Sequence, residues 1–219
     1  MIEKLQKYLS ANYPNSDLHA PYSIEGRVHI RFELGDDLKN GTKKRVVQAI
    51  ARANEIFNRA FTDVNSELWI VFYEYPEEQF NSYEEQRNYI YGLFDKSKRT
   101  SLFEDQISIK VGFFETDENG NEFEETTPVK IGIHKLNQKE FDIHGLITGI
   151  ANLEMGFSPK VPQQVFIFDP ITNNGFYMYD DRGCYVWGDN ADKIRNIYES
   201  LNHWIVDYHR SEIDEYFKV

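Results

Sequence analysis

The sequence predicts an α+β fold, with a mostly antiparallel sheet of about six to seven strands covered by four to five helices. The first indication is the order of segments: strand-like stretches occur next to one another, which favours hairpins over a doubly wound α/β arrangement. The second is composition, since 219 residues with 41% hydrophobic and 15% aromatic side chains can bury a core without disulfides or metal. No internal repeat or low-complexity linker is present, so we expect residues 1–219 to form a single globular domain.

The N-terminal part of the chain alternates helical and extended patterns. Residues 1–12 gather their apolar side chains on one side of a helix, and residues 27–34 alternate apolar and charged side chains as a half-buried strand does. Residues 43–61 form the most regular helical pattern, for which Thr42 is the expected N-cap. Residues 68–75 are apolar on both faces, which is typical of a central strand.

A helix and a long hairpin are expected in the middle of the chain. Residues 77–95 fit the helix, with apolar side chains on one face. Residues 107–113 and 129–133 alternate in hydrophobicity, and an Asn-Gly pair between them is a strong hairpin signal. We therefore expect a hairpin excursion around residues 115–128, kept soluble by its acidic side chains.

The C-terminal part predicts a helix, three strands and a closing helix. In the helix at 139–155, Gly145 and Gly149 lower the helix propensity, which indicates close packing at both positions. The three strands span residues 165–168, 176–179 and 184–187. From Asn190 we expect one long helix, with a break near Ser211. Its expected inward side chains are Ile194, Ile197, Leu201, Trp204, Ile205 and Tyr208.

Charge and cysteine content narrow the function. The net charge of −12 repels phosphate backbones, which disfavours nucleic-acid binding and favours a basic protein partner. Cys184 is the single cysteine, so no intrachain disulfide can form, and we expect it to be a small buried apolar residue. No signal-peptide pattern, membrane-length apolar run, or nucleotide or zinc motif occurs. We expect a cytoplasmic protein without membrane contact, cofactor or metal; the oligomeric state is not indicated.

Three aspartates near strand ends form the first candidate binding site. Asp169 follows a buried strand, and Asp180 and Asp181 lie in a tight turn between two aromatic strands. If adjacent strand ends bring Asp169 and Asp180 together, the carboxylates can bind Mg²⁺ or act as acid and base. The alternative is turn chemistry, because aspartates cap turns and Arg182 can neutralise the carboxylates itself. We assign no catalytic residue.

The polar face of the strand at 27–34 is the second candidate. His29, Arg31 and Glu33 form a row at the spacing of a strand, which can grip an anionic group or transfer a proton. The alternative is a solvated sheet face with local ion pairing.

A stripe of arginines on the helix at 43–61 is the third candidate. Arg45, Arg52 and Arg59 recur every seven residues and so share one side of the helix. Such a stripe can bind a carboxylate or phosphate. The alternative is pairing with acids of the same helix such as Glu55, one turn from Arg59.

Five stretches of the chain form an ordered set of motifs, which are Arg31–Gly35, Arg52–Phe57, Ile150–Phe157 with Val165–Asp169, Tyr179–Cys184 and Trp204–Tyr208. Together they resemble the bacterial family catalogued as domain of unknown function 3885. The resemblance implies a single bacterial domain and carries over no activity and no catalytic residue. In size and in its acidic Tyr-Asp-Asp-Arg-Gly turn, the chain is also similar in style to the small immunity proteins that neutralise bacterial toxins.

Three hypotheses of different classes follow. The first is an acidic cytoplasmic binding protein of immunity or inhibitor type that neutralises a basic toxin or nuclease. The second is a metal-dependent hydrolase using Asp169, Asp180 and Asp181. The third is a sensor of a small anionic ligand that uses His29, Arg31 and the arginine stripe, with a preformed pocket lined by Tyr and Phe. We rank the first highest, because the chain is strongly acidic and contains no catalytic motif.

Overall fold

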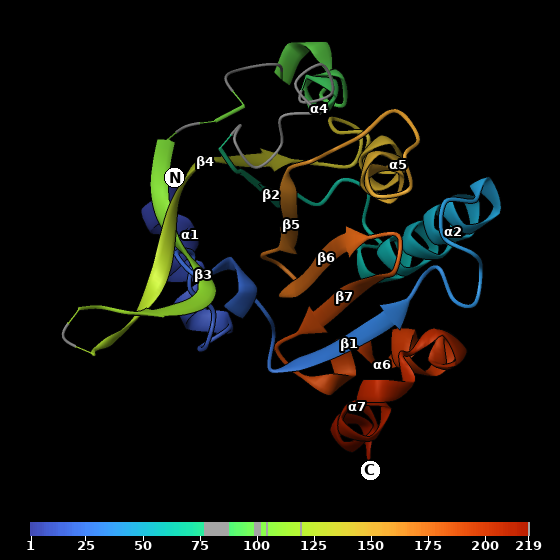
Figure 1. Ribbon diagram of the computed structural model, residues 1–219. Coiled ribbons are helices and arrows are strands. Elements are labelled where there is room, and N and C mark those ends of the chain that lie inside the picture. Colours follow the sequence, from blue (N-terminus) through green and yellow to red (C-terminus); the bar gives the residue numbers. More distant parts are fainter. Residues whose placement is uncertain (77–87, 99–101, 104, 119, 219) are drawn as a thin grey trace.

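A single antiparallel sheet organises the molecule. The computed structural model describes residues 1–76, 88–98, 102–103, 105–118 and 120–218. Within them, seven strands form the sheet in the order β1-β7-β6-β5-β2-β4-β3 (Figure 1). The strands are β1 (Val28–Glu33), β2 (Leu68–Glu74), β3 (Asp105–Thr116), β4 (Glu122–Leu136), β5 (Gln164–Asp169), β6 (Asn174–Asp180) and β7 (Gly183–Gly188). Every neighbouring pair is antiparallel, which confirms the expected α+β fold.

Helices cover the two faces of the sheet unequally. The helices are α1 (Ile2–Asn12), α2 (Lys43–Ala60), α4 (Tyr89–Gly92), α5 (Ile143–Leu153), α6 (Ala191–Ser200) and α7 (Arg210–Phe217). Short 3₁₀ turns span Pro21–Ser23, Lys96–Lys98, Asn202–Trp204 and Asp207–His209. α2, α5, α6 and α7 pack in one apolar core, whereas α1 belongs to a second core on the opposite face (Figure 1).

The central strand β2 serves both cores. Its residues are buried along the whole length of the strand, as expected. Ile70 and Phe72 belong to the core under the larger helices, whereas Val71 and Tyr73 belong to the core under α1. This alternation follows from the strand geometry, which points successive side chains to opposite faces. Both faces of the sheet are therefore covered at β2.

Local predictions about caps and glycines are confirmed. Thr42 Oγ1 accepts a hydrogen bond from Arg45 N at 3.4 Å and caps α2. A Cβ added at Gly149 would lie 2.4 Å from Val161 Cγ2, so the helix needs glycine at this close approach. Cys184 is fully buried, and burial raises the pKa of its thiol.

The start of one helix differs from the sequence prediction, and a second predicted helix is only partly described. The helix expected at 139–155 begins at Ile143, because Asp142 is its N-cap and accepts a hydrogen bond from Gly145 N at 2.9 Å. The helix expected at 77–95 falls largely outside the described residues. Within the described part of that segment, the short helix α4 places Ile90 in the core.

The prediction of one long closing helix is wrong. α6 ends at Ser200, and the backbone at Ile205 and Val206 is extended. The N–H of Val206 donates to the carbonyl oxygen of Arg31 at 3.1 Å, so this segment covers the otherwise free edge of β1. Covering an edge satisfies backbone groups that a continuous helix would leave unpaired. As a result Tyr208, expected inward, is 86% exposed.

The hairpin of β3 and β4 extends beyond the sheet. Its pairing shifts between Lys110 and Phe114, where Gly112 has a φ of 76°. A bulge of this kind bends a hairpin, and the distal part turns away from the sheet and projects from the molecule (Figure 1). Beyond the bulge most side chains on both faces are exposed. We call this part, residues 112–118 and 120–125, the acidic arm; it overlaps the excursion expected around 115–128.

Candidate functional site

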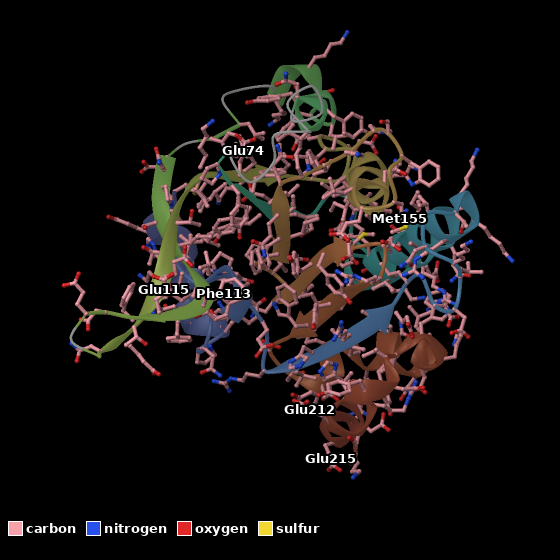
Figure 2. All side chains as sticks on the ribbon, in the orientation of Figure 1. Glu74, Phe113, Glu115, Met155, Glu212 and Glu215 are labelled. Carbon is pink, nitrogen blue, oxygen red and sulfur yellow. The ribbon has the colours of Figure 1, made fainter. Side chains whose placement is uncertain are left out.

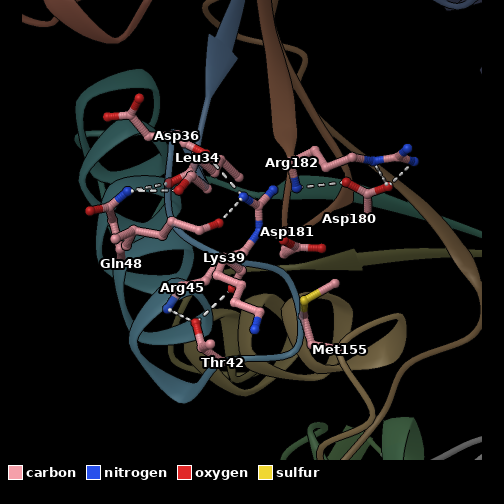
Figure 3. Close-up of polar contacts among 12 residues, drawn as sticks. Leu34, Asp36, Lys39, Thr42, Arg45, Gln48, Met155, Asp180, Asp181 and Arg182 are labelled. Atoms are coloured by element: carbon pink, nitrogen blue, oxygen red, sulfur yellow. Dashed lines mark hydrogen bonds and ion pairs between the residues drawn. The ribbon is translucent and has the colours of Figure 1, made fainter.

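The turn between β6 and β7 contains a buried ion pair (Figure 3). Arg45 of α2 donates its Nε–H to Asp181, and both side chains are buried. Arg45 Nη1 also donates to the carbonyl oxygens of Asp36 and Leu38, at 3.0 Å and 2.7 Å. The guanidinium thereby joins the turn, α2 and the loop after β1. Because its hydrogen bonds are made to the protein itself, this pair acts as a structural tie.

Asp180 points away from Asp181 and toward Arg182 (Figure 3). It accepts hydrogen bonds from the backbone N–H and from Nε of Arg182, both at 2.7 Å, and from Nη2. The hydrogen bond with Asp180 raises the pKa of the Arg182 guanidinium. The two groups neutralise each other within the turn, as the turn-chemistry alternative expected.

Asp169 lies at the opposite end of β6 from Asp180. The register pairs Asp169 with Asn174 at one end and Asp180 with Gly183 at the other, so the length of the strand, about 20 Å, separates them. Asp169 Oδ1 instead accepts a hydrogen bond from Ser66 Oγ at 3.3 Å. The structure does not bring the two carboxylates together, because consecutive strands reverse direction. Among the described residues, no group of three or more His, Cys, Asp or Glu is arranged to hold a metal ion.

The arginines of α2 are also bound within the protein. Arg52 Nη2 donates to Asp36 Oδ2 at 3.0 Å, and this hydrogen bond lowers the pKa of the Asp36 carboxyl. Arg59 Nε donates to Glu55 Oε1 at 2.7 Å, which is the pairing along the helix that the alternative described. Since Arg45 pairs with Asp181, each arginine of the stripe binds a different carboxylate of the protein.

The polar row on β1 is only partly solvated. Arg31 donates from Nε and Nη2 to the hydroxyl oxygen of Tyr179, at 3.2 Å and 3.0 Å. Its guanidinium carbon lies 5.4 Å and 5.6 Å from the ring centroids of Tyr179 and Tyr185. His29 also packs against Tyr185, with ring centroids 6.4 Å apart, whereas Glu33 is exposed at the end of the strand. The neighbours of this row are therefore tyrosines.

Those tyrosines cover the margin of the sheet face that α1 occupies. The register places Arg31 opposite Tyr185, Tyr185 opposite Tyr177, and Tyr177 opposite Phe166. Tyr75 donates its hydroxyl hydrogen to Gln164 Oε1 at 3.0 Å. Gln164 Nε2 in turn donates to the hydroxyl oxygen of Tyr177 at 3.1 Å. We call this surface the tyrosine face, which consists of Tyr22, Tyr75, Tyr177, Tyr179 and Tyr185.

Tyr179 reaches Arg31 because Gly183 leaves room for it. A Cβ added at Gly183 would lie 2.2 Å from the Tyr179 hydroxyl oxygen and 2.7 Å from the carbonyl oxygen of Phe32. Burial raises the pKa of both Tyr177 and Tyr179. Both hydroxyl oxygens accept hydrogen bonds, from Gln164 and from Arg31 respectively.

Three cavities lie along the tyrosine face. Their volumes are about 350, 260 and 130 Å³. Tyr22 lines the first and third, Tyr75 the first and second, and Tyr177 the second and third, so each cavity shares a wall residue with the other two, and we call the three together the hollow. Phe113 of the acidic arm forms part of its wall. A concave surface lined by tyrosines with a few oriented polar groups is typical of a binding site.

The acidic arm borders this hollow. Between residues 111 and 129 the sequence contains no lysine or arginine, and its carboxylates are Glu115, Asp117, Glu118, Glu122, Glu124 and Glu125. Its three phenylalanines, Phe113, Phe114 and Phe123, are 70%, 67% and 46% exposed. Figure 2 shows Phe113 and Glu115 together on the arm. Tyr22 donates its hydroxyl hydrogen to Glu124 Oε1 at 2.6 Å, which lowers the pKa of the Glu124 carboxyl and joins the arm to the tyrosine face.

The tyrosine face is not among the candidate sites that the sequence predicts. The sequence predicts strands for Tyr177, Tyr179 and Tyr185 and places a candidate site at the turn between those strands. The signal that identifies the face is period-two alternation, because these tyrosines alternate with the core residues Met178 and Cys184. Such a pattern places several phenols on one face of a hairpin.

These features define an α+β protein with a buried arginine–aspartate tie on one side of its sheet and an open, tyrosine-lined face on the other. The chain belongs to the family described as domain of unknown function (DUF3885), which matches residues 5–209 and confirms the resemblance seen in the motifs. No curated protein and no solved structure matches the chain. Among the helices in the described part of the chain, none has the length and apolarity needed to cross a membrane.

Proposed function

We propose that the chain is a binding protein of the immunity or inhibitor type, whose partner is a basic protein such as a toxin or nuclease. The acidic arm is the observation that carries this proposal. It is a hairpin that projects from the sheet and combines carboxylates with exposed phenylalanines, and it contains no lysine or arginine. The tyrosine face beside it supplies a second contact surface.

The charge of the arm supports recognition of a basic surface. The whole chain has a net charge of −12, and the arm places a local excess of negative charge on a projecting element. Complementary potentials steer two proteins together and accelerate association, by an amount that falls as salt screens the field. An acidic partner or a nucleic acid would be repelled by the same surface.

The aromatic side chains support a specific contact rather than charge attraction alone. Phe113 and Phe114 are among the most exposed large apolar side chains of the described residues. Exposed apolar groups clustered on a surface mark interaction sites, and aromatic anchors with tyrosines carry much of the binding free energy in protein interfaces. We infer that the phenylalanines anchor the partner after the carboxylates have oriented it.

The test compares the wild-type chain with two variants of equal charge. The arm variant is Glu115→Gln/Glu122→Gln/Glu125→Gln, and the control variant is Glu3→Gln/Asp37→Asn/Glu199→Gln, which changes exposed carboxylates elsewhere. Each is used to capture proteins at low salt from an extract of the organism that encodes the chain. Captured proteins are identified by mass spectrometry, and the purified pair is studied by calorimetry at about 50 and 300 mM salt.

We expect a basic protein that binds the wild type and the control variant, with an affinity that falls at least about tenfold between the two salt concentrations. The arm variant should bind it at least about tenfold more weakly than the control variant. Equal binding by the two variants, or capture of no basic protein by any of the three, would contradict the proposal.

The hydrolase and sensor hypotheses stay predictions. Asp169, Asp180 and Asp181 each accept hydrogen bonds from neighbouring protein groups, and these bonds give a hydrolase site no geometric support. A Mg²⁺-dependent rise in melting temperature would favour that hypothesis. For the sensor, a preformed cavity lined by tyrosines is present, and Arg31 is the group to which an anion would bind.

A further inference from the structure

The smallest of the three cavities is lined mainly by aromatic side chains and by one carboxylate. Its volume is about 130 Å³, and it is lined by Pro21, Tyr22, Ile24, Glu25, Phe166, Tyr177 and Tyr185. Four of these seven residues are aromatic and one is a carboxylate. None of the described residues that line it is a lysine or an arginine.

The floor of the cavity is built by the sheet. Phe166, Tyr177 and Tyr185 are cross-strand neighbours on β5, β6 and β7. The rings of Phe166 and Tyr177 stack, with centroids 4.4 Å apart and planes inclined by 20°. A floor fixed by strand register and ring stacking is preorganised before any ligand arrives.

The opposite wall is the 3₁₀ turn Pro21–Ser23. Its Tyr22 hydroxyl is held by Glu124 of the acidic arm at 2.6 Å. Through this hydrogen bond the arm fixes the position of the ring. A partner that contacts the arm is therefore placed beside the cavity.

Glu25 gives the cavity its charge. Its side chain is 49% exposed, and His29 Nδ1 lies 3.8 Å from Glu25 Oε2. Among the described residues, Glu25 forms no ion pair with a lysine or arginine. Its half-exposed carboxylate lines the cavity and can face a cation that enters there.

We propose that this cavity, with Glu25 at its mouth and Tyr22, Phe166, Tyr177 and Tyr185 as its walls, receives an alkylammonium group, namely a lysine side chain of the basic partner. The proposal rests on the proposed function and adds the chemistry of one contact. The faces of aromatic rings carry partial negative charge and attract ammonium groups, and a carboxylate adds to that attraction.

Arg31 already makes a cation–π contact with one ring of the cavity, and its positive charge disfavours a cationic ligand. Its guanidinium lies against the Tyr185 ring, 5.6 Å from the centroid, so this ring already contacts one cation. The positive charge of Arg31 repels a second cation nearby. Replacing Arg31 by glutamine should therefore strengthen binding of an ammonium ligand and weaken binding of a carboxylate.

The test uses small probes and the full chain, followed by NMR chemical-shift changes of backbone amides and tyrosine rings. The cationic probes are choline and N-acetyl-lysine methylamide. The neutral probe, 3,3-dimethylbutan-1-ol, has the shape of choline without its charge, and benzoate is the anionic probe. We expect both cations to shift Tyr22, Ile24, Tyr177 and Tyr185, and the neutral probe to bind at least about threefold more weakly.

Single substitutions separate the contributions of ring, charge and arm. Tyr177→Leu and Glu25→Gln should each weaken choline binding by about threefold to tenfold. Tyr22→Phe keeps the ring and loses the hydrogen bond to Glu124, so most of the binding should remain. Tyr208→Leu, at an exposed position away from the cavity, is the control and should change nothing.

The outcomes that would overturn the proposed ammonium site are as follows. Equal binding of choline and its neutral analogue would show a plain apolar cavity and overturn the proposal, and tighter binding of benzoate would show an anion site at Arg31 instead. Absence of any shift with all four probes would also overturn it. If the arm variant loses the basic partner while Tyr177→Leu retains it fully, the proposed function stands and the lysine contact is wrong. Preferential binding of choline over the lysine probe would indicate a free quaternary ammonium ligand.

Discussion

Polar side chains are paired and buried on one face of the sheet, whereas on the other face they border open cavities. On the side of α2, Arg45 and Asp181 are buried together, and the remaining hydrogen bonds of Arg45 go to backbone carbonyls. On the other side, Arg31 contacts a phenol instead of a carboxylate, and the tyrosine hydroxyls surround open cavities. Saturated polar groups stabilise a fold, whereas polar groups left available at a concave surface can bind a partner.

This difference explains why the most charged motif is not the best candidate site. The Tyr179–Cys184 turn concentrates two aspartates and an arginine, yet each charge forms an ion pair with another residue of the chain. Residues on the open face were less conspicuous in the sequence because tyrosines also occur in ordinary strands. The predictions that follow test this separation between a face that stabilises the protein and a face that binds.

The largest effect is expected from breaking the buried pair. Asp181→Ala leaves the Arg45 guanidinium buried without its carboxylate, which should lower the free energy of unfolding by about 3–5 kcal/mol. Urea unfolding followed by circular dichroism measures this change. In contrast, Glu55→Gln breaks the more exposed pair with Arg59 and should cost no more than about 1 kcal/mol. Equal effects of the two substitutions would show that the turn is not a structural tie.

The next effect is a loss of stability in alkali. Burial raises the pKa of Tyr8 from 10.0 to about 12. A raised pKa means that the folded state holds the proton more tightly than the unfolded state, so this contribution is complete below pH 10 and is lost as the pH rises through 12. The expected loss for this group is about 2–3 kcal/mol, measured by urea unfolding at several pH values. Tyr8→Phe should flatten the decline, whereas Tyr208→Phe should leave it unchanged.

A smaller effect is expected where Tyr179 crosses β7. Gly183→Ala places a methyl group against the Tyr179 hydroxyl and the Phe32 carbonyl, and should cost about 1–3 kcal/mol and disturb the contact with Arg31. Gly92→Ala is the matched control, because an added Cβ there meets no atom of another described element within 4 Å. If the two substitutions had the same effect in denaturant unfolding, Gly183 would not be needed for this crossing.

The smallest effect on stability is expected from the acidic arm. Glu115→Gln/Glu122→Gln/Glu125→Gln changes side chains that are exposed on the projecting hairpin, so the free energy of unfolding should change by no more than about 0.5 kcal/mol per substitution. Thermal and urea unfolding measure it. A large loss of stability would mean that the arm supports the fold and would remove the reason to assign it to binding.

Much of the fold could be predicted from the sequence because its signals are local. The period of α2, the cap at Thr42 and the apolar run of β2 each depend on neighbours in the chain. The sequence predicts a break near Ser211, but the end of α6 at Ser200 could not be predicted, because it depends on the pairing of Val206 with Arg31, far away in the sequence. The local sequence pattern favours one continuous helix, but pairing with the edge of β1 makes the chain extended at Ile205 and Val206.

In the candidate site, too, contacts between residues close in the sequence could be predicted, whereas contacts between distant residues could not. The turn chemistry of Asp180 and Arg182 and the pairing of Arg59 with Glu55 involve residues close in the sequence, so the sequence predicts both as alternatives. The tyrosine face depends on the register of separate strands and on the bend of the arm, which bring Tyr22 to Glu124. Sequence periodicity indicates which residues share a face, but only the assembled sheet shows which face stays open.

Amide hydrogen exchange of the chain, alone and in complex with the basic protein it captures, tests the central claim most directly. We predict slower exchange in the acidic arm and at residues 20–25, with α6 and α7 unchanged. Slower exchange confined to α6 and α7, with the arm exchanging as in the free chain, would contradict the account.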